Sequence, residues 1–277
     1  MISVIIPAYN EETYIKTCLE LVLASDQPPG PPVQVIVAAN GCIDATAQVA
    51  RALTDDFAAK GWRLDVLELS EGSKTKALNA GDAIAQFDIR AYVDADVHVS
   101  PALIGELARV LDRPDAAYAG GRPQIRATRN FISKRYARFW QNLPFMADGV
   151  PGCGVYAVNA AGRARWDQFP DVISDDMFVR FHFAQDEMIG VDPTYSWPIT
   201  AEFKALVRVR RRQDQGLAEL RDLLPDLAAD SERTAPDIAT KAALFLRDPI
   251  GFVIYAAVAV TVHTPLFRNR RRWERGR

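Results

Sequence analysis

The chain has 277 residues, of which 49% are hydrophobic and 25% are charged, and its formal net charge at pH 7 is −2. This length allows one large domain or one domain with an appendage, and this composition excludes a globally disordered protein. The weak negative charge argues against general nucleic-acid binding.

The three cysteines lie far apart in the sequence and form neither a CxxC pair nor a Cys/His pattern suited to a metal. The first residues lack a basic stretch and a cleavage site, so we interpret them as the first strand of a domain rather than as a signal peptide. An odd number of cysteines without a signal peptide is typical of a reducing compartment. We therefore expect a cytoplasmic protein.

Short apolar runs alternate with amphipathic segments over the first 110 residues. The runs are rich in β-branched residues, which is typical of buried strands. We expect strands at 2–6, 33–38, 64–69 and 91–93, and helices at 13–24, 44–60, 73–86 and from Ser100 onward. This alternation predicts an α/β domain in which helices flank a mostly parallel sheet. Ligands of such sheets bind beyond the carboxyl ends of the strands.

The pattern changes in the second half of the chain. It is mixed from residue 117 to residue 212, and a glycine-rich stretch interrupts it at 149–154. Beyond Gly216 it becomes helical and amphipathic. We therefore expect one α/β domain over 1–216 and a helical C-terminal extension over 217–277.

The extension contains an apolar segment, 249–267, followed at 268–277 by six arginines and one glutamate. Its uninterrupted apolar core, 251–262, is about half of the roughly 20 residues that a membrane-spanning helix needs. An apolar helix with a basic, tryptophan-containing tail predicts peripheral contact with an anionic membrane. The alternative is a core or dimer helix with a solvated tail, and the sequence leaves the oligomeric state open.

Asp94 and Asp96 stand two residues apart, directly after a predicted buried strand. Two carboxylates this close cost free energy unless a positive charge lies between them. Mg²⁺ and Mn²⁺ prefer such oxygen ligands and usually take one or two carboxylates together with substrate phosphates. The pair therefore predicts a divalent metal site, although an isolated D-x-D pattern is more often a surface turn.

Five segments of the chain together resemble glycosyltransferase family 2, which has the GT-A fold. They occur in the family's order: VIIPAYNEE at 4–12, VIVAANGCIDAT at 35–46, KTKALNAG at 74–81, YVDAD at 92–96 and ISDDMFV at 173–179. The resemblance covers 1–216 and implies a Rossmann-like domain that transfers a sugar, with inversion, from a nucleotide sugar to a glycan or lipid-linked acceptor. It implies UDP as the nucleotide, with GDP or dTDP as alternatives.

The resemblance implies a donor site at the carboxyl edge of the sheet. Pro7, Ala8 and Tyr9 would line the nucleoside pocket, where the Tyr9 ring can stack on a base. Glu11 would accept hydrogen bonds from the ribose hydroxyl groups. Lys74 matches a lysine that lies near the nucleotide in relatives, with a solvated helix start as the alternative.

Three further positions are implied to read the base and hold the metal. Asp94 would contact the ribose or the metal, and Asp96 would bind the metal directly. Asn40 stands where family members usually carry an aspartate that reads the base. Asparagine offers a donor as well as an acceptor, and its oxygen can still accept the N3–H of uracil.

Asp175 and Asp176 match the family's acidic pair that contains the catalytic base. Inverting transfer needs a carboxylate that takes the proton of the attacking acceptor hydroxyl. Adjacent carboxylates repel each other, which raises the pKa of at least one and favours a base. The resemblance places the base at Asp176, with Asp175 as the alternative.

Two other segments have implied roles in the site. Gly152, Cys153 and Gly154 resemble the loop on the acceptor side, where glycine lets the backbone approach a ligand. Arg211 and Arg212 fall near an arginine-rich family segment and could hold the diphosphate through charge-assisted hydrogen bonds. A plain turn and a solvated basic face are the respective alternatives.

Two other functions are weighed against this one. A nucleotidyltransferase also uses a nucleotide-binding α/β fold, but it usually has a glycine-rich, arginine-containing loop where this chain has residues 7–11. A non-catalytic nucleotide-sugar-binding module would explain Asn40, yet all four candidate carboxylates are present.

Overall fold

The computed structural model describes residues 1–26, 32–127, 130–147, 150–230 and 237–267. The chain forms two compact units, the first made of 1–123 and 150–197 and the second of 124–149 and 198–277. The basic segment 268–277 lies outside the described residues. The domain boundary predicted at residue 216 lies inside a helix of the second unit and stays a prediction.

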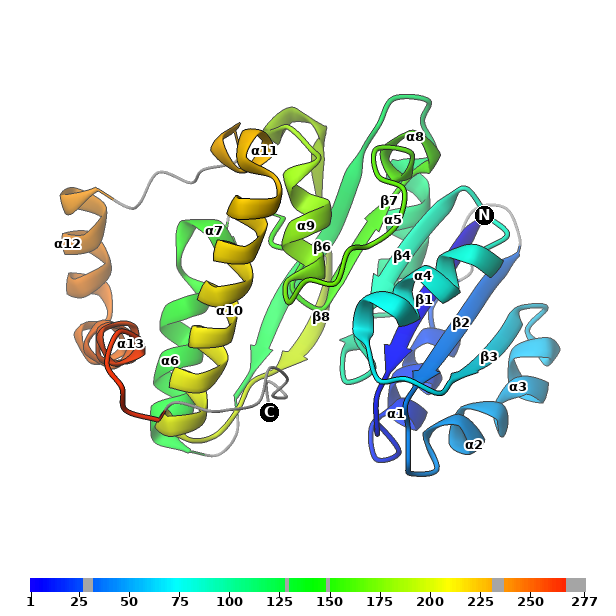
Figure 1. Ribbon diagram of the computed structural model, residues 1–277, viewed down its shortest axis with the longest axis horizontal. Coiled ribbons are helices and arrows are strands. Elements are labelled where there is room, and N and C mark those ends of the chain that lie inside the picture. The colour runs from blue at the N-terminus through cyan, green and yellow to red at the C-terminus, as the bar shows by residue number, and fades with distance from the viewer. Residues whose placement is uncertain (27–31, 128–129, 148–149, 231–236, 268–277) are drawn as a thin grey trace. The chain divides into compact units, whose positions relative to one another are not determined.

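Four parallel strands form the first half of the sheet, in the order β3-β2-β1-β4 (Figure 1). Their bounds are β1 Ile2–Ala8, β2 Val33–Asn40, β3 Arg63–Leu69 and β4 Ile89–Val93. All residues of β1 and β2 are buried, as expected for parallel strands that are covered on both faces. The predicted parallel α/β arrangement is thus confirmed for this half.

The other half of the sheet is antiparallel, so the sheet, which has eight strands within the described residues, is mixed. It continues from β4 in the order β7-β6-β8-β5, and the β4–β7, β6–β7 and β5–β8 pairs are antiparallel. The bounds are β5 His98–Val99, β6 Tyr118–Arg126, β7 Val155–Val158 and β8 Met188–Pro198. β6, β7 and β8 lie in the part of the sequence, 117–212, whose mixed pattern did not indicate strands.

Helices cover both faces of the parallel strands. They are α1 Ile15–Leu23, α2 Thr46–Arg51, α3 Thr54–Ala59, α4 Lys74–Ile84 and α5 Leu103–Leu111. Val4 and Ile6 belong to the apolar cluster that contains α1, whereas Ile5 points to the other face. There a Cβ on Gly81 of α4 would lie 2.5 Å from Ile5 Cγ2, so glycine allows α4 to pack directly on β1.

Two predicted helices differ from those observed. The helix expected over 44–60 is divided into α2 and α3, because Ala52 and Leu53 form a turn in which Thr54 Oγ1 donates to the Arg51 carbonyl (2.8 Å). The helix expected from Ser100 begins only at Leu103. The Ser100 amide donates to the Thr194 carbonyl (3.0 Å) and the Ser100 carbonyl accepts from the Leu103 amide (3.1 Å), so a turn precedes this helix.

The first unit also contains the short helices α8 Ala160–Arg163 and α9 Asp175–Phe181 and the 3₁₀ turn η1 Gln185–Glu187. The second unit is mainly helical: α6 Phe131–Gln141, α7 Pro144–Ala147, α10 Phe203–Leu223, α11 Pro225–Asp230, α12 Ile238–Arg247 and α13 Pro249–Val262. Among the described residues, no helix has the length and apolar character needed to cross a membrane.

Candidate active site

The loop after β1 supplies the predicted nucleoside wall. Pro7 and Ala8 end the strand and are buried, whereas the Tyr9 side chain is 47% exposed. A Cβ built on Gly72 would lie 3.2 Å from Cε2 of the Tyr9 ring, so this glycine leaves room for the ring. An exposed aromatic ring at the carboxyl end of a parallel strand is suited to stacking on a base.

Side-chain hydrogen bonds fasten this loop to the loop after β2. Oδ1 of Asn10 accepts from the Ile43 amide (2.8 Å), and Oγ1 of Thr46 accepts from the amide of the buried Glu11 (2.7 Å). Asn10 itself has a left-handed backbone (φ 52°), which asparagine tolerates better than most residues. The two loops therefore form one preorganised edge.

Asn40 is buried at the end of β2, and its amide group has a fixed orientation. Nδ2 donates to the carbonyl oxygens of Ala8 (2.9 Å) and Ala38 (3.3 Å). Within the described part of the chain, no donor to Oδ1 is found. The side-chain NH₂ group thus donates to backbone carbonyls, and the side-chain oxygen can accept a hydrogen bond from a ligand.

Asp94 and Asp96 lie in a tight turn at the end of β4. The Val97 amide donates to the Asp94 carbonyl (3.0 Å), and the Asp94 amide donates to the Gly154 carbonyl (2.9 Å). Ala95 and Val97 are buried, while both aspartates are partly exposed. Two accessible carboxylates on one turn fit Mg²⁺ or Mn²⁺, which use few protein ligands and complete their coordination with phosphate and water.

No group of three or more His, Cys, Asp or Glu residues suited to a metal is found in the described ranges. A fully protein-made metal cage is therefore not present in that part of the chain. Coordination by one or two carboxylates and substrate phosphates does not need such a cage.

Lys74, at the start of α4, joins the two acidic parts of the site. Its Nζ lies 2.8 Å from Oδ1 of Asp94 and 3.0 Å from Oδ1 of Asp175. Burial disfavours the ammonium group, but the charges of Asp175 and Asp94 outweigh burial and raise the pKa of Lys74. This contact brings together residues that are 81 positions apart in the sequence.

Asp175 and Asp176 occupy the first turn of α9, where a helix favours negative charge. Asp175 is buried, and the Tyr156 hydroxyl donates to its Oδ2 over 3.2 Å. Asp176 is partly exposed and accepts at Oδ1 from the Met177 amide (2.8 Å). Burial and the adjacent Asp175 charge raise the pKa of Asp176 to about 6. Asp176 therefore has the properties of a base near neutral pH.

The glycine-rich loop is tightly packed. Gly152 and Gly154 have φ values of +73° and +79°. A Cβ on Gly152 would lie 2.0 Å from Oη of Tyr118, so no side chain fits there. The Cys153 carbonyl accepts from the Tyr195 hydroxyl (2.7 Å), and burial raises the pKa of the Cys153 thiol to about 12. Cys153 thus has the character of a packing residue rather than a nucleophile.

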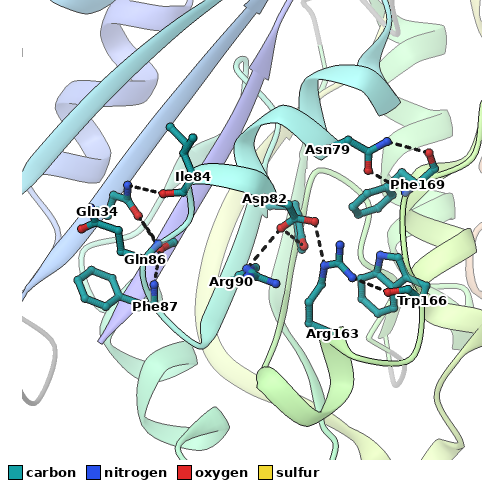
Figure 2. Close-up of polar contacts among 12 residues, drawn as sticks. Gln34, Asn79, Asp82, Ile84, Gln86, Phe87, Arg90, Arg163, Trp166 and Phe169 are labelled. Carbon is teal, nitrogen blue, oxygen red and sulfur yellow. Dashed lines mark hydrogen bonds and ion pairs between the residues drawn. The ribbon is translucent and has the colours of Figure 1, made fainter.

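Sequence reasoning missed the polar contacts that hold the chain before α9 (Figure 2). Asn79 of α4 donates to the Phe169 carbonyl (3.0 Å) and accepts from the Phe169 amide (2.8 Å). Asp82 accepts from Nε of Arg163 (2.9 Å), whose Nη1 donates to the Trp166 carbonyl (2.6 Å). No short motif signals the Asn79–Phe169 and Asp82–Arg163 pairs, because their members are 90 and 81 positions apart in the sequence.

Tyr156 was also missed, since a tyrosine in a strand after a glycine-rich loop reads only as a core residue.

Arg211 and Arg212 belong to α10 in the second unit. The Arg211 guanidinium donates to four carbonyl oxygens at and just beyond the end of α13, namely those of Thr261, Val262, Thr264 and Leu266. These contacts satisfy carbonyl groups that a helix end leaves without partners. Diphosphate binding by Arg211 and Arg212 stays a prediction.

The sequence comparison decides the family. The model of glycosyl transferase family 2 matches residues 3–167, which contain the donor edge, the D-x-D turn and the glycine-rich loop. The chain belongs to this family. The match ends before the acidic pair on α9, so the assignment of these carboxylates depends on the geometry above.

Relatives of this glycosyltransferase family 2 chain cover only part of it. "Uncharacterized glycosyltransferase EpsJ" of Bacillus subtilis (strain 168) is 27% identical over 107 residues, which are 39% of this chain and 29% of EpsJ. "Putative glycosyltransferase EpsH" of the same organism is 23% identical over 52% of this chain and 40% of EpsH. The match thus spans less than half of either relative.

Solved structures share the fold over nearly the whole chain. The mannosyltransferase PcManGT from Pyrobaculum calidifontis, in complex with GDP-Man and Mn²⁺, superposes with a TM-score of 0.59 at 19% identity, covering 95% of this chain and 75% of PcManGT. S. aureus TarS 1-349 in complex with UDP-GlcNAc gives 0.57 at 15% identity, covering 96% and 76% respectively. The predicted GT-A fold is confirmed.

Proposed function

We propose that the chain is an inverting, metal-dependent glycosyltransferase that moves a sugar from a nucleoside diphosphate sugar to a hydroxyl group of a glycan or lipid-linked acceptor. The observation that carries the proposal is the double ion pair of Lys74. It brings Asp94 of the D-x-D turn and Asp175 of the acidic pair to within 3.0 Å of one ammonium group. Diphosphate binding and proton removal would thus occur side by side.

The proposed donor site extends along the carboxyl edge of β1 and β2. Tyr9 would stack on the base, Pro7 and Ala8 would form the pocket floor, and Glu11 would accept from ribose hydroxyl groups. Because Asn40 uses its amide donor on Ala8 and Ala38, its Oδ1 would accept the ring N–H of the base. Uracil, thymine and guanine carry such a group and cytosine does not. We therefore propose UDP as the nucleotide, with dTDP or GDP as alternatives.

The two solved neighbours support a donor of this class. PcManGT was solved with GDP-Man and Mn²⁺, and TarS 1-349 with UDP-GlcNAc. Both ligands are nucleoside diphosphate sugars with a base that carries a ring N–H. We infer a ligand of the same class here, without choosing its sugar.

A bound Mg²⁺ or Mn²⁺ would offset the charge that develops on the leaving nucleoside diphosphate. Asp96 would bind it directly and Asp94 would contact it or the ribose. Lys74 would add a fixed positive charge beside them. Arg211 and Arg212 are retained as candidate diphosphate ligands, with the same electrostatic role.

The proposed reaction is a single displacement. Asp176 takes the proton of the acceptor hydroxyl as its oxygen forms a bond to the anomeric carbon. The bond from this carbon to the diphosphate oxygen breaks on the opposite side, and its electron pair leaves with the nucleoside diphosphate. Asp175, which already accepts from Lys74 and Tyr156, is engaged in the structure, so Asp176 is the better base. Gly152, Cys153 and Gly154 would border the acceptor.

The first test is a thermal-shift and calorimetric screen of UDP, GDP, dTDP and CDP, each with and without Mn²⁺. A ligand of the folded state raises the midpoint of unfolding with the logarithm of its concentration. We expect metal-dependent stabilisation by one nucleotide other than CDP, and its loss in Asp96→Ala. Equal binding of UDP and Mn²⁺ by Asp96→Ala would show that the metal assignment is wrong.

A non-catalytic binding module is the remaining alternative. The variant Asp176→Asn distinguishes the two functions, because it removes the proposed base but leaves the donor edge intact. We expect this variant to bind the donor and Mn²⁺ as the wild type does and to lose sugar transfer. A wild-type protein that binds the donor but neither hydrolyses nor transfers its sugar to any acceptor in a glycan and glycolipid panel would favour the binding module.

We also propose that the protein works at the cytoplasmic face of the cell membrane, in peripheral contact with it. The support is the apolar α13 and the six arginines of 268–277, which suit an anionic surface. A lipid-linked acceptor would be presented at the same place.

A further inference from the structure

The outer side of α13 is an apolar stripe. The helix is apolar on all sides, yet only part of its surface is covered. Ile250, Val253, Ala257 and Val260 are exposed, and their spacing of three and four residues places them on one face of the helix. Val260 alone is 68% exposed. A helix that is apolar all round is expected to be buried or to lie in lipid.

The inner side of α13 is held firmly by the second unit. Tyr255 stacks on Tyr136 of α6 (centroids 5.4 Å apart), and Nη1 of Arg210 donates to its hydroxyl (2.7 Å). Phe252 meets Phe139 edge to face at 5.8 Å. These contacts fix the rotation of α13, so the exposed stripe is a property of the folded unit rather than of a detached helix.

The preceding helix, α12, carries a second apolar stripe. None of its ten residues is buried, although most are apolar. Ile238, Ala242, Phe245 and Leu246 are exposed and share one face, and Ile238 and Leu246 are 85% and 80% exposed. Phe245 packs edge to face on Phe252 (5.4 Å), which joins α12 to α13.

α12 and α13 are each too short to cross a membrane. At 1.5 Å per residue, the 14 residues of α13 extend about 21 Å and the ten residues of α12 about 15 Å, short of the roughly 30 Å of a bilayer core. A helix of this kind lies in the plane of the interface, with its apolar face among the acyl chains.

The charged residues of α12 and of the sequence after α13 indicate the kind of partner. Lys241 and Arg247 of α12 are exposed, and the sequence after α13 adds six arginines, one glutamate and Trp273. Apolar stripes that carry two exposed cations and are followed in the sequence by six arginines match an anionic bilayer, because lipid head groups attract cations while the acyl chains take up apolar side chains. A second copy of this chain would bring the same positive charge against itself.

We infer that α12 and α13 form one membrane-docking surface, defined by the exposed residues Ile238, Ala242, Phe245, Leu246, Ile250, Val253, Ala257 and Val260, which lies in the plane of an anionic bilayer. The inference rests on the membrane contact in the proposed function. It extends that contact to α12, whose sequence alone suggested only an amphipathic extension, and assigns it to named side chains.

The experiment is flotation of the full chain with vesicles of phosphatidylcholine and phosphatidylglycerol in equal parts, and with phosphatidylcholine alone. Wild type should bind the anionic vesicles, and binding should weaken as salt rises. Ile238→Asp/Leu246→Asp and Val253→Asp/Val260→Asp should each lower the partition coefficient at least tenfold, because each removes two apolar side chains that would insert among the acyl chains.

Two further variants make the result specific. Leu223→Asp changes an exposed leucine of α10 outside both stripes and should bind as wild type does. Val253→Lys/Val260→Lys removes the same apolar surface but adds positive charge. It should also bind at least tenfold more weakly, and undiminished binding would overturn the insertion of the stripes. Circular dichroism melting confirms that each variant is folded.

Calorimetric donor binding on the same samples separates this inference from the proposed function. Donor binding without vesicle binding overturns the docking surface and leaves the glycosyltransferase proposal standing. Vesicle binding that both aspartate variants lose supports the docking surface whether or not a donor binds. A wild-type dimer in light scattering that these variants convert to monomer, without vesicle binding, would assign the surface to a second copy instead.

Discussion

The Tyr156 hydroxyl donates to Oδ2 of Asp175 over 3.2 Å, while its stacked neighbour Tyr92, with ring centroids 4.9 Å away, donates to Asp82. Both tyrosines are buried, on adjacent strands of the sheet. The two hydroxyl groups therefore differ in one respect that matters for catalysis, because only that of Tyr156 contacts the acidic pair. They form a matched pair for mutagenesis.

We predict that Tyr156→Phe lowers kcat about fivefold while the Kd of the donor nucleotide stays unchanged, since a buried hydrogen bond contributes about 1 kcal/mol. Without this donor, the negative charge of Asp175 is less neutralised and repels a charge on Asp176 more strongly. The acid limb of the pH profile of kcat/KM should therefore move to higher pH. Initial rates across a pH series would measure both effects.

Tyr92→Phe is the control for that measurement. It removes the same atom from an equally buried ring, so it should lower the unfolding midpoint by a similar amount and leave the acid limb in place. If both variants shift the limb equally, or neither does, Tyr156 has only a packing role.

The pKa of about 6 for Asp176 gives a second prediction, on stability. An acid whose pKa is raised by folding stabilises the folded state in its protonated form. This contribution is complete below the ordinary pKa of aspartate and is lost as pH rises through about 6. Asp176→Asn, which cannot ionise, should therefore be more stable than wild type above pH 6, and the difference should vanish as pH falls toward 4. Urea titrations at several pH values would show a constant difference if Asp176 is not the perturbed group.

Local patterns predicted the parallel half of the fold because its strands are short, β-branched and separated by regular helices. β1 and β2 were placed to within two residues of their observed ends. The antiparallel half was not predicted, since β5 to β8 are fixed by partners distant in sequence. β5 shows the effect directly, because its two residues, His98 and Val99, pair with Ser196 and Tyr195 of β8.

For the site, sequence motifs indicated the carboxylates and the strand end that carries the D-x-D pair. They did not indicate which residues contact these carboxylates. The proximity of Asp94 to Asp175 becomes visible only through Lys74 in the folded chain. Tyr156 and Asn79 contact residues that lie 19 and 90 positions away in the sequence, and such pairs leave no periodic signal.

A third prediction concerns the glycine-rich loop. Gly152→Ala would place a methyl group 2.0 Å from Oη of Tyr118 on a left-handed backbone, so we expect a loss of about 2–4 kcal/mol in the free energy of unfolding. Tyr118→Phe removes the clashing oxygen. The double variant should therefore recover part of the loss and retain the backbone cost of about 1–2 kcal/mol. Chemical denaturation of the four proteins measures the coupling, and purely additive effects would contradict the clash.

The orientation of Asn40 gives the last prediction. Since Nδ2 is bound to the Ala8 and Ala38 carbonyls, Asn40→Ala removes an acceptor from the proposed base pocket and leaves the Ala8 oxygen without its donor. The affinity for UDP should fall about tenfold, which corresponds to one hydrogen bond, and the variant should also be less stable. CDP provides the control, because its ring nitrogen has no hydrogen to donate. Any weak CDP binding should hardly change, so the ratio of UDP to CDP affinity should fall. If both affinities fall equally, Asn40 supports the pocket wall but does not read the base.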